Sequence, residues 1–337
     1  MLSLVQIKHP ESGRRTAKVD GNRLVVLRGY ESAYALARAA TAPGASIAER
    51  VANSLGDESL DYEEVYSGRS PWKLLPPFDH PEDEARCLVS GTGLTHIVSA
   101  SARNSMHATQ AETAPKTDSI RIYEWGVEGG RPRPGSVGVQ PEWFYKGDGA
   151  CMRAHGQPLE IPTYAKDGGE ESEVASAYLI ADDGRPWRVG FMIGNEFSDH
   201  LTERENYLYL AHSKLRQCGV GPELVVDLKF DDIRGRATVK RNGGSVWSRE
   251  LATGERNMCH SLANLEHHHF KYAVHRRPGD VHIHFLGAGA LSFADGVSLE
   301  AGDVVEIDIP ALGRSLRSIV DDHRGEETLC AVNSLGG

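Results

Sequence analysis

The chain has 337 residues, 40% of them hydrophobic and 25% charged, which is the composition of an ordinary folded protein with enough residues for a sizeable core. Its 47 acidic residues outnumber its 37 basic ones, and no run is rich in lysine or arginine, which argues against nucleic-acid binding. The apolar runs are far shorter than the roughly 18 residues of a membrane span, and the first residues lead into charge. We therefore expect neither a membrane span nor a signal peptide.

The five cysteines are widely spaced, odd in number and contain no Cys-x-x-Cys pair. This pattern argues against a disulfide framework and against a thiolate zinc site, and it predicts a cytoplasmic protein. The 36 glycines indicate many turns, as in a strand-rich fold, and the 15 histidines raise the question of histidine chemistry.

Residues 1–80 are predicted to form a small α+β domain. Three short apolar segments are candidate strands, and two later segments have helical spacing of apolar residues, each with a serine at its start. A proline-rich connector over 70–78 then marks the boundary. The expected strands are 2–7, 15–19 and 23–27, and the expected helices are 32–40 and 46–55.

Residues 81–337 are predicted to form a mainly β domain, a mixed roll or sandwich. Short apolar segments alternate with glycine and proline, and only 203–210 and 258–270 have a helical pattern. The expected strands are 87–90, 174–180, 188–193, 224–227, 281–286 and 304–309.

Two glutamates at the start of one predicted strand are the first candidates for chemistry. On a strand over 171–179, Glu171 and Glu173 point to the same face, where two carboxylates repel each other unless a cation lies between them. Carboxylate oxygens suit Mg²⁺, Mn²⁺ or Ca²⁺ better than zinc. The alternative is that Glu170, Glu171 and Glu173 are a solvated strand start.

A third carboxylate and a lysine follow. Glu196 ends an apolar run over 190–193, as expected of a strand that delivers a ligand to a pocket. Lys214 comes shortly after a predicted helix and could neutralise a substrate carboxylate or move a proton. A surface lysine is the alternative.

Together these motifs resemble the fumarylacetoacetate hydrolase superfamily over roughly 86–320. Glu171 and Glu173 resemble its Glu-x-Glu metal pair, Glu196 takes the place of its metal-binding aspartate, and Lys214 lies at or near its active-site lysine. The segment 141–146 resembles its Pro-x-x-Phe-x-Lys motif, and 278–281 and 300–306 resemble two of its turns. The resemblance implies the superfamily's catalytic fold, one Mg²⁺ or Mn²⁺ ion, and a homodimer. It also implies substrate-binding roles for Lys146, Ser198 and His96.

Three departures narrow the resemblance. Glutamate replaces aspartate at 196, Asp199-His200 replaces an Ala-Arg pair, and 287–289 reads Gly-Ala-Gly where the superfamily has Gly-Thr. These changes are similar to the sugar-acid branch of the superfamily, the 2-keto-3-deoxypentonate dehydratases.

The histidines divide into two groups. His96 and His107 lie where hydrolases of the superfamily place the histidine that activates water, and His107 matches better. The run 267–269 cannot bind one metal with all three rings, because successive helical residues point about 100° apart. His282 and His284 share a strand face in a His-x-His pattern typical of zinc or iron sites, but no glutamate follows closely.

The resemblance predicts a metal-dependent dehydratase of 2-keto-3-deoxy sugar acids that converts a 2-keto-3-deoxypentonate into 2,5-dioxopentanoate and water through an enolate. Lys214 and His107 are the expected proton-transfer residues. One alternative is a C–C hydrolase of acylpyruvates or other 2,4-diketo acids on the same scaffold. Another is a sugar-acid-binding protein without catalysis.

Overall fold

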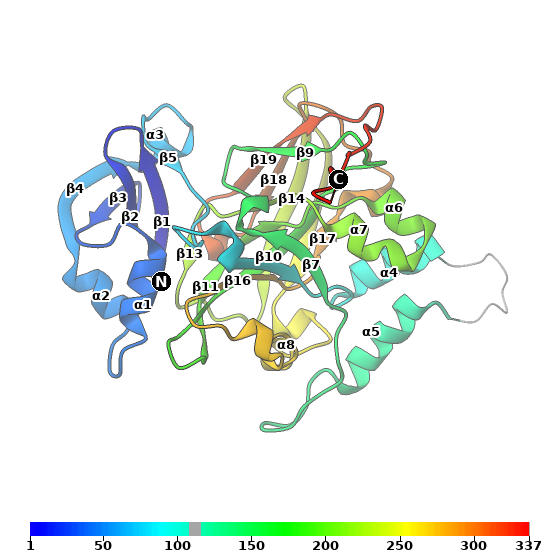
Figure 1. Cartoon of the computed structure of the whole chain (residues 1–337), viewed down its shortest axis with the longest axis horizontal. Coiled ribbons are helices and arrows are strands. Elements are labelled where there is room, and N and C mark those ends of the chain that lie inside the picture. Colours follow the sequence, from blue (N-terminus) through cyan, green and yellow to red (C-terminus); the bar gives the residue numbers. More distant parts are fainter. Residues whose placement is uncertain (108–115, 337) are drawn as a thin grey trace.

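The computed structural model describes residues 1–107 and 116–336, with only the backbone of His107. Two β-sheets make up most of the molecule, and helices lie at its periphery (Figure 1). The expectation of a mainly β, α+β protein is confirmed.

The N-terminal unit contains a four-stranded antiparallel arrangement, and its first three strands and two helices agree with the prediction. Ser32 and Ser46 cap helices α1 and α2, because each side chain accepts a hydrogen bond from the backbone three residues later. The unit consists of β1 (Ser3–His9), β2 (Gly13–Asp20), β3 (Arg23–Leu27), α1 (Ala33–Ala40), α2 (Ile47–Asn53), β4 (Leu55–Asp61), α3 (Tyr62–Tyr66) and β5 (Lys73–Leu74).

The strands of this unit continue into the rest of the molecule. Strand β1 pairs with β13 (Leu224–Val225), so that Leu4 lies opposite Leu224. A large sheet therefore contains strands from both sides of the predicted domain boundary at residue 80. The division into two domains at this residue stays a prediction. Its strand order is β4-β3-β2-β1-β13-β11-β10-β16-β6-β7.

The central strand of the large sheet, β10, is long and fully buried. All ten residues of β10 (Glu171–Ile180) are buried, and β10 pairs antiparallel with β11 (Pro186–Asn195) and β16 (Val281–Phe285). Beyond β16 lie β6 (Cys87–Gly91) and β7 (Phe144–Asp148). The short strands β8 (Met152–Arg153), β12 (Cys218–Val220) and β17 (Ala290–Leu291) attach at the sides.

A second sheet packs against the first through the main hydrophobic core. Apolar side chains of β10 and β11, such as Val174 and Ile193, meet those of the second sheet, such as Val239 and Ile307. Neither sheet closes into a barrel within the described residues. The second sheet has the order β15 (Gly244–Thr253), β14 (Ile233–Arg241), β18 (Val304–Asp308), β19 (Leu316–Asp322), β9 (Pro158–Ile161).

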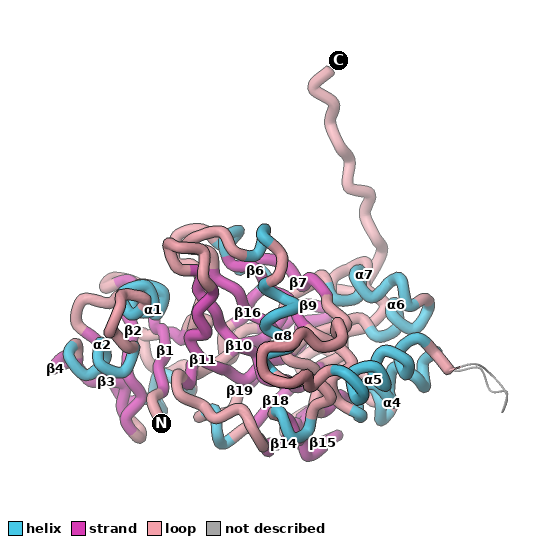
Figure 2. The backbone as a smooth tube through the Cα atoms, turned by 90° about the horizontal axis from the view of Figure 1, so that it is seen from below, coloured by secondary structure: helices cyan, strands magenta, loops and turns pink. Residues whose placement is uncertain are grey.

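The helices differ from the prediction. Two of them, α4 (Ile97–His107) and α5 (Asp118–Gly129), were not predicted. Helix α4 contains three serines and an asparagine, which favour caps over helix interiors. The predicted helix over 203–210 is divided into α6 (His200–Glu205) and α7 (Leu210–Lys214), and α8 (Leu262–Phe270) begins later than expected. Figure 2 shows α4 to α7 at one end of the molecule. No described helix is long and apolar enough to cross a membrane.

Candidate metal and proton-transfer site

Three buried carboxylates meet where β10 begins and β11 ends. In the antiparallel register Glu173 lies opposite Gly194, and the backbone N–H of Glu196 donates to the carbonyl of Glu171 at 2.9 Å. One ligand oxygen from each of Glu171, Glu173 and Glu196 lies within 4.8 Å of the other two. The structure therefore brings together all three predicted metal ligands, which we call the carboxylate cluster.

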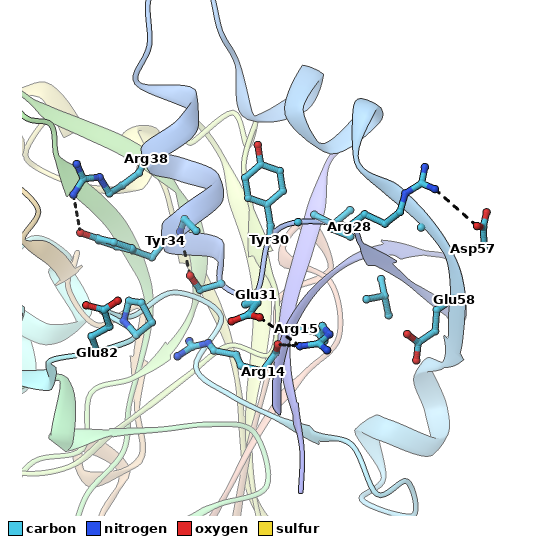
Figure 3. Close-up of a pocket in the computed structure, with 17 residues that line it drawn as sticks. Arg14, Arg15, Arg28, Tyr30, Glu31, Tyr34, Arg38, Asp57, Glu58 and Glu82 are labelled. Atoms are coloured by element: carbon cyan, nitrogen blue, oxygen red, sulfur yellow. Dashed lines mark hydrogen bonds and ion pairs between the residues drawn. The ribbon is translucent and has the colours of Figure 1, made fainter. Parts of the chain in front are cut away.

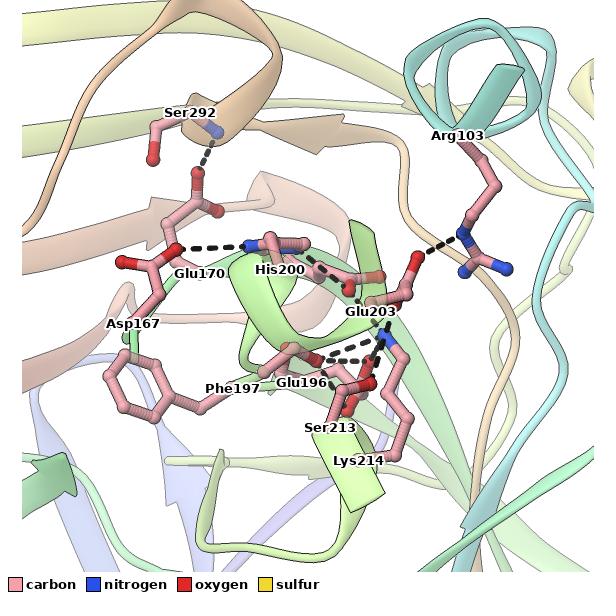
Figure 4. A network of polar contacts seen from close by, with 12 residues as sticks. Arg103, Asp167, Glu170, Glu196, Phe197, His200, Glu203, Ser213, Lys214 and Ser292 are labelled. Carbon is pink, nitrogen blue, oxygen red and sulfur yellow. Dashed lines mark hydrogen bonds and ion pairs between the residues drawn. The ribbon is translucent and has the colours of Figure 1, made fainter. Parts of the chain in front are cut away.

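Two buried lysines, Lys146 and Lys214, neutralise part of this charge, and Figure 4 shows Lys214 beside Glu196. The Nζ atom of Lys214 lies 2.5 Å from Glu196 Oε2 and 2.9 Å from Ser198 Oγ, and it also contacts Glu171 Oε1. Lys146 Nζ lies 2.6 Å from Glu196 Oε1 and donates to the carbonyl of Lys214. With all three carboxylates ionised, the two ammonium groups leave one net negative charge.

The carboxylates differ in protonation. Burial raises the pKa of Glu173 well above its usual value, and repulsion from Glu196 and Glu171 raises it further. Burial would also raise the pKa of Glu171, but Lys214 and His200 outweigh it and hold that pKa well below its usual value. Burial would lower the pKa of Lys214, yet Glu171 and Glu196 raise it above its ordinary value.

His200 is a site residue that the sequence did not single out. Its Nε2 lies 3.1 Å from Glu171 Oε1, its Nδ1 lies 3.9 Å from Asp167, and its ring stacks on Phe293. Burial would lower its pKa, but the hydrogen bond and charge of Glu171 raise it. The replacement of the superfamily's arginine by this histidine was the only sequence signal.

Glu170 is buried as well, so the alternative of a solvated strand start is wrong. Its carboxyl accepts hydrogen bonds from the Ser292 backbone N–H at 2.5 Å and from Ser172 Oγ at 2.8 Å. Burial raises the pKa of Glu170 to about 7. It belongs to the opposite strand face from Glu171, since successive residues of a strand alternate.

A second layer of ion pairs fixes the helices around the cluster. Arg103 of α4 is buried between Glu142, at 3.1 Å, and Glu203 of α6, and Tyr207 donates to Glu142 at 2.8 Å. Ser213, next to Lys214, donates to Glu203 at 3.4 Å. Arg103 therefore joins α4 to the segment that carries Lys214.

The predicted substrate-binding residues have different surroundings. Ser198 Oγ lies 3.1 Å from both oxygens of Glu196, within the cluster. His96 lies next to Gly287, whose backbone N–H donates to Glu173 at 2.7 Å. However, both ring nitrogens of His96 contact threonine hydroxyls, at 2.9 and 3.0 Å. Burial lowers the pKa of His96 to about 4. The side chain of the predicted catalytic residue His107 lies outside the described residues.

A separate group of histidines lies on the other face of the large sheet. His284 pairs with Ser176 on β10, whereas Glu173 shares the face of Ala175 and Phe285. The rings of His269, His275, His282 and His284, which we call the histidine cluster, have centroid distances from His269 of 4.5 to 5.0 Å. Among the described residues, only the carboxylate cluster brings three potential metal ligands together.

The N-terminal unit carries a hollow of its own, about 1090 Å³ in volume (Figure 3). Four arginines line it, Arg14, Arg15, Arg28 and Arg38, but four acidic side chains line it too. Since these charges balance and none of the predicted site residues lies there, we assign it no role.

The carboxylate cluster fits a divalent cation by the chemistry of its donors. Hard oxygen ligands from three converging carboxylates are the set that Mg²⁺ and Mn²⁺ prefer. Burial raises the pKa of Glu173, and the repulsion from Glu196 and Glu171 that adds to it is the part that a bound cation would relieve. With all three carboxylates ionised, a divalent cation would bring the net charge of the cluster to +1, which suits an anionic ligand.

Comparisons with known proteins agree with this interpretation. No family model matches the chain. A probable 2-keto-3-deoxyxylonate dehydratase of Haloferax volcanii is 25% identical over 185 residues, which are 53% of this chain and 60% of that relative. The match thus spans less than two thirds of the relative's length.

Solved structures resemble nearly the whole chain. The apo form of 2-keto-3-deoxy-D-arabinonate dehydratase has a TM-score of 0.70 at 18% identity and covers 96% of this chain and 100% of its own. The same enzyme complexed with magnesium and 2,5-dioxopentanoate has a TM-score of 0.69 at 18% identity, with the same coverage. A 5-carboxymethyl-2-hydroxymuconate delta-isomerase from Mycobacterium smegmatis has a TM-score of 0.57 at 18% identity and covers 96% and 100% of the two chains.

The fold and the carboxylate cluster define a protein with a buried carboxylate site suited to a divalent metal on one face of its large sheet. More narrowly, the chain has the fold of the solved 2-keto-3-deoxy-D-arabinonate dehydratase and of the delta-isomerase, and the fold predicted from the resemblance is confirmed.

Proposed function

We propose that this protein is a divalent-metal-dependent dehydratase of 2-keto-3-deoxy sugar acids. The observation that carries the proposal is the convergence of three buried carboxylates and a buried lysine on one point. The solved structure with magnesium and 2,5-dioxopentanoate, and the 2-keto-3-deoxyxylonate dehydratase relative, support this reaction rather than C–C hydrolysis.

In this proposal Glu171, Glu173 and Glu196 hold Mg²⁺ or Mn²⁺. A cation there would act as a Lewis acid toward the ketone of a 2-keto acid and make the neighbouring C3 protons more acidic. The single positive charge of the loaded cluster would also favour the substrate carboxylate. Ser198 and Lys146 hold Glu196 in place, because both contact its carboxylate oxygens.

Lys214 is the group proposed to move a proton. It shares Glu171 and Glu196 with the proposed cation, so its ammonium loses part of its stabilisation when these carboxylates are engaged elsewhere, and its proton is then released more easily. Lys214 would take a proton from C3, and His107 or water would give a proton to the leaving C4 hydroxyl. Loss of one water and tautomerisation give 2,5-dioxopentanoate.

A substrate panel with Mg²⁺ or Mn²⁺ tests the proposal. We expect 2-keto-3-deoxypentonates to lose the mass of one water, and acylpyruvates to remain intact. Glu171→Gln should lower turnover at least about 100-fold, because it removes one ligand and one partner of Lys214. Glu250→Gln, at an exposed glutamate of β15, is the matched control and should keep full turnover. Cleavage of acylpyruvates with addition of water would favour the hydrolase instead.

A homodimer in the cytoplasm remains part of the proposal. Analytical ultracentrifugation of the purified chain and fractionation of cells that express it would test the two statements separately.

A further inference from the structure

Two cysteines that are far apart in the sequence meet beside the carboxylate cluster. Cys151 and Cys218 are separated by 67 positions, yet their sulfur atoms lie 3.9 Å apart. Strands β8 and β12 pair in parallel with Cys218 opposite Met152, the residue after Cys151. The sheet itself therefore fixes the encounter of the two thiols.

The two thiols differ in a way that suits oxidation. Cys151 is partly exposed, whereas Cys218 is buried. Their mutual hydrogen bond lowers the pKa of Cys151, burial opposes this, and the nearby Lys146 lowers it further. The absence of a side chain at Gly147 makes room for Cys151, since a Cβ atom at residue 147 would lie 3.2 Å from the Cys151 sulfur. Cys151 is thus the thiol that a small oxidant reaches first.

We propose that Cys151 and Cys218 form a reversible intramolecular disulfide when the protein meets a peroxide. The Cys151 thiolate attacks one peroxide oxygen, which breaks the O–O bond and leaves a sulfenic acid and hydroxide. The Cys218 thiol then attacks the Cys151 sulfur, forms the S–S bond and releases water. The two sulfurs are oxidised by two electrons in all, and the peroxide is reduced to two waters.

The link would join two segments that serve the carboxylate cluster. Lys146 lies shortly before Cys151, and Lys214 lies shortly before Cys218. Both lysines contact Glu196, so the disulfide would tie together the chain on which both cluster cations lie. This inference goes beyond the proposed dehydratase, and its test requires no turnover.

Hydrogen peroxide applied to the full-length Cys330→Ser protein tests the proposal. The variant removes the exposed cysteine and leaves four thiols. We expect two of the four to disappear on mild oxidation and to return with dithiothreitol. Peptide mapping without reduction should show Cys151 linked to Cys218, with the loss of two hydrogen atoms.

Two variants distinguish a Cys151–Cys218 disulfide from links to other cysteines. Cys151→Ser should form no link, and Cys218→Ala should trap a sulfenic acid at Cys151 that a 1,3-diketone probe labels. Cys87 is the competing partner, because its buried side chain lies near Gly149, which belongs to the same turn as Cys151. Retention of all four thiols in the oxidised folded protein, a Cys87–Cys151 link, or irreversible oxidation of Cys151 in the presence of Cys218 would each overturn the proposal.

Discussion

The two faces of the large sheet hold buried titratable groups in opposite ways. On one face Lys146 and Lys214 lie among the glutamates of the carboxylate cluster and compensate part of their negative charge. On the other face the histidine cluster has no acidic partner among the described residues, and burial lowers the pKa of His282 and His284 to about 3. Charge compensation leaves one face ready to bind a cation, whereas desolvation makes the other a neutral part of the core.

The histidine cluster is held by hydrogen bonds between neutral groups. His284 contacts Ser90 and Thr92 through its two nitrogens, at 2.9 and 2.7 Å, and His269 Nε2 lies 2.9 Å from His282 Nδ1. The abundance of histidine in the sequence therefore reflects packing at these positions, and the chemistry belongs to the glutamates.

Removal of one lysine ammonium group from the carboxylate cluster should have the largest effect on stability. Lys146→Met leaves Glu196 buried without one of its two ammonium partners, and we expect the free energy of unfolding to fall by about 3–5 kcal/mol. Denaturant unfolding of the metal-free protein measures this loss. Lys166→Met, which breaks an exposed ion pair with Glu205, is the control and should cost about 0–1 kcal/mol. Equal losses in the two variants would contradict the comparison.

Metal binding should stabilise the folded protein by an intermediate amount. At 100 times its dissociation constant Mg²⁺ should add about 2.7 kcal/mol, visible as a higher Tm that returns to its starting value with a chelator. Glu173→Gln should abolish this rise, because one ligand loses its charge. The metal-free variant should be at least as stable as the parent, since repulsion from Glu171 and Glu196 disappears. A full Mg²⁺ response in Glu173→Gln would remove that residue from the site.

The histidine cluster should make stability fall at acid pH. The pKa of His284 is about 3 in the folded protein, below the ordinary value of 6.5, so between these values the unfolded chain binds the proton more tightly. This contribution is complete above pH 6.5 and is lost at up to about 1.4 kcal/mol per pH unit below it.

We expect His284→Gln to show a shallower loss between pH 6.5 and 4.5 in denaturant unfolding. His212→Gln, at an exposed residue, should follow the parent, because that ring remains in water in both states. An unchanged slope in His284→Gln would show that this histidine takes up no excess proton on unfolding.

The regular part of the fold could be predicted from local pattern. The alternation and β-branched residues of β1, β3, β10 and β16 gave their positions, and the serine caps marked α1 and α2. Helix α4 could not be predicted in this way, because Arg103 secures it through Glu142 and Glu203, which are distant in sequence. The long hairpin of β14 and β15 was also missed, since many of its residues are exposed and polar.

The sequence by itself determined the proposed metal ligands and the proposed proton-transfer lysine: Glu171 and Glu173 share a strand face by the period of two, and Glu196 and Lys214 follow in the order of the motif that the chain resembles. Only the tertiary structure decided that His200 and Lys146 contact these carboxylates, that Glu170 is buried, and that Cys151 meets Cys218. The physical reason is the separation along the chain of the residues that interact. Periodicity is a property of neighbouring residues, whereas burial and charge pairing depend on strand register between segments far apart in the chain.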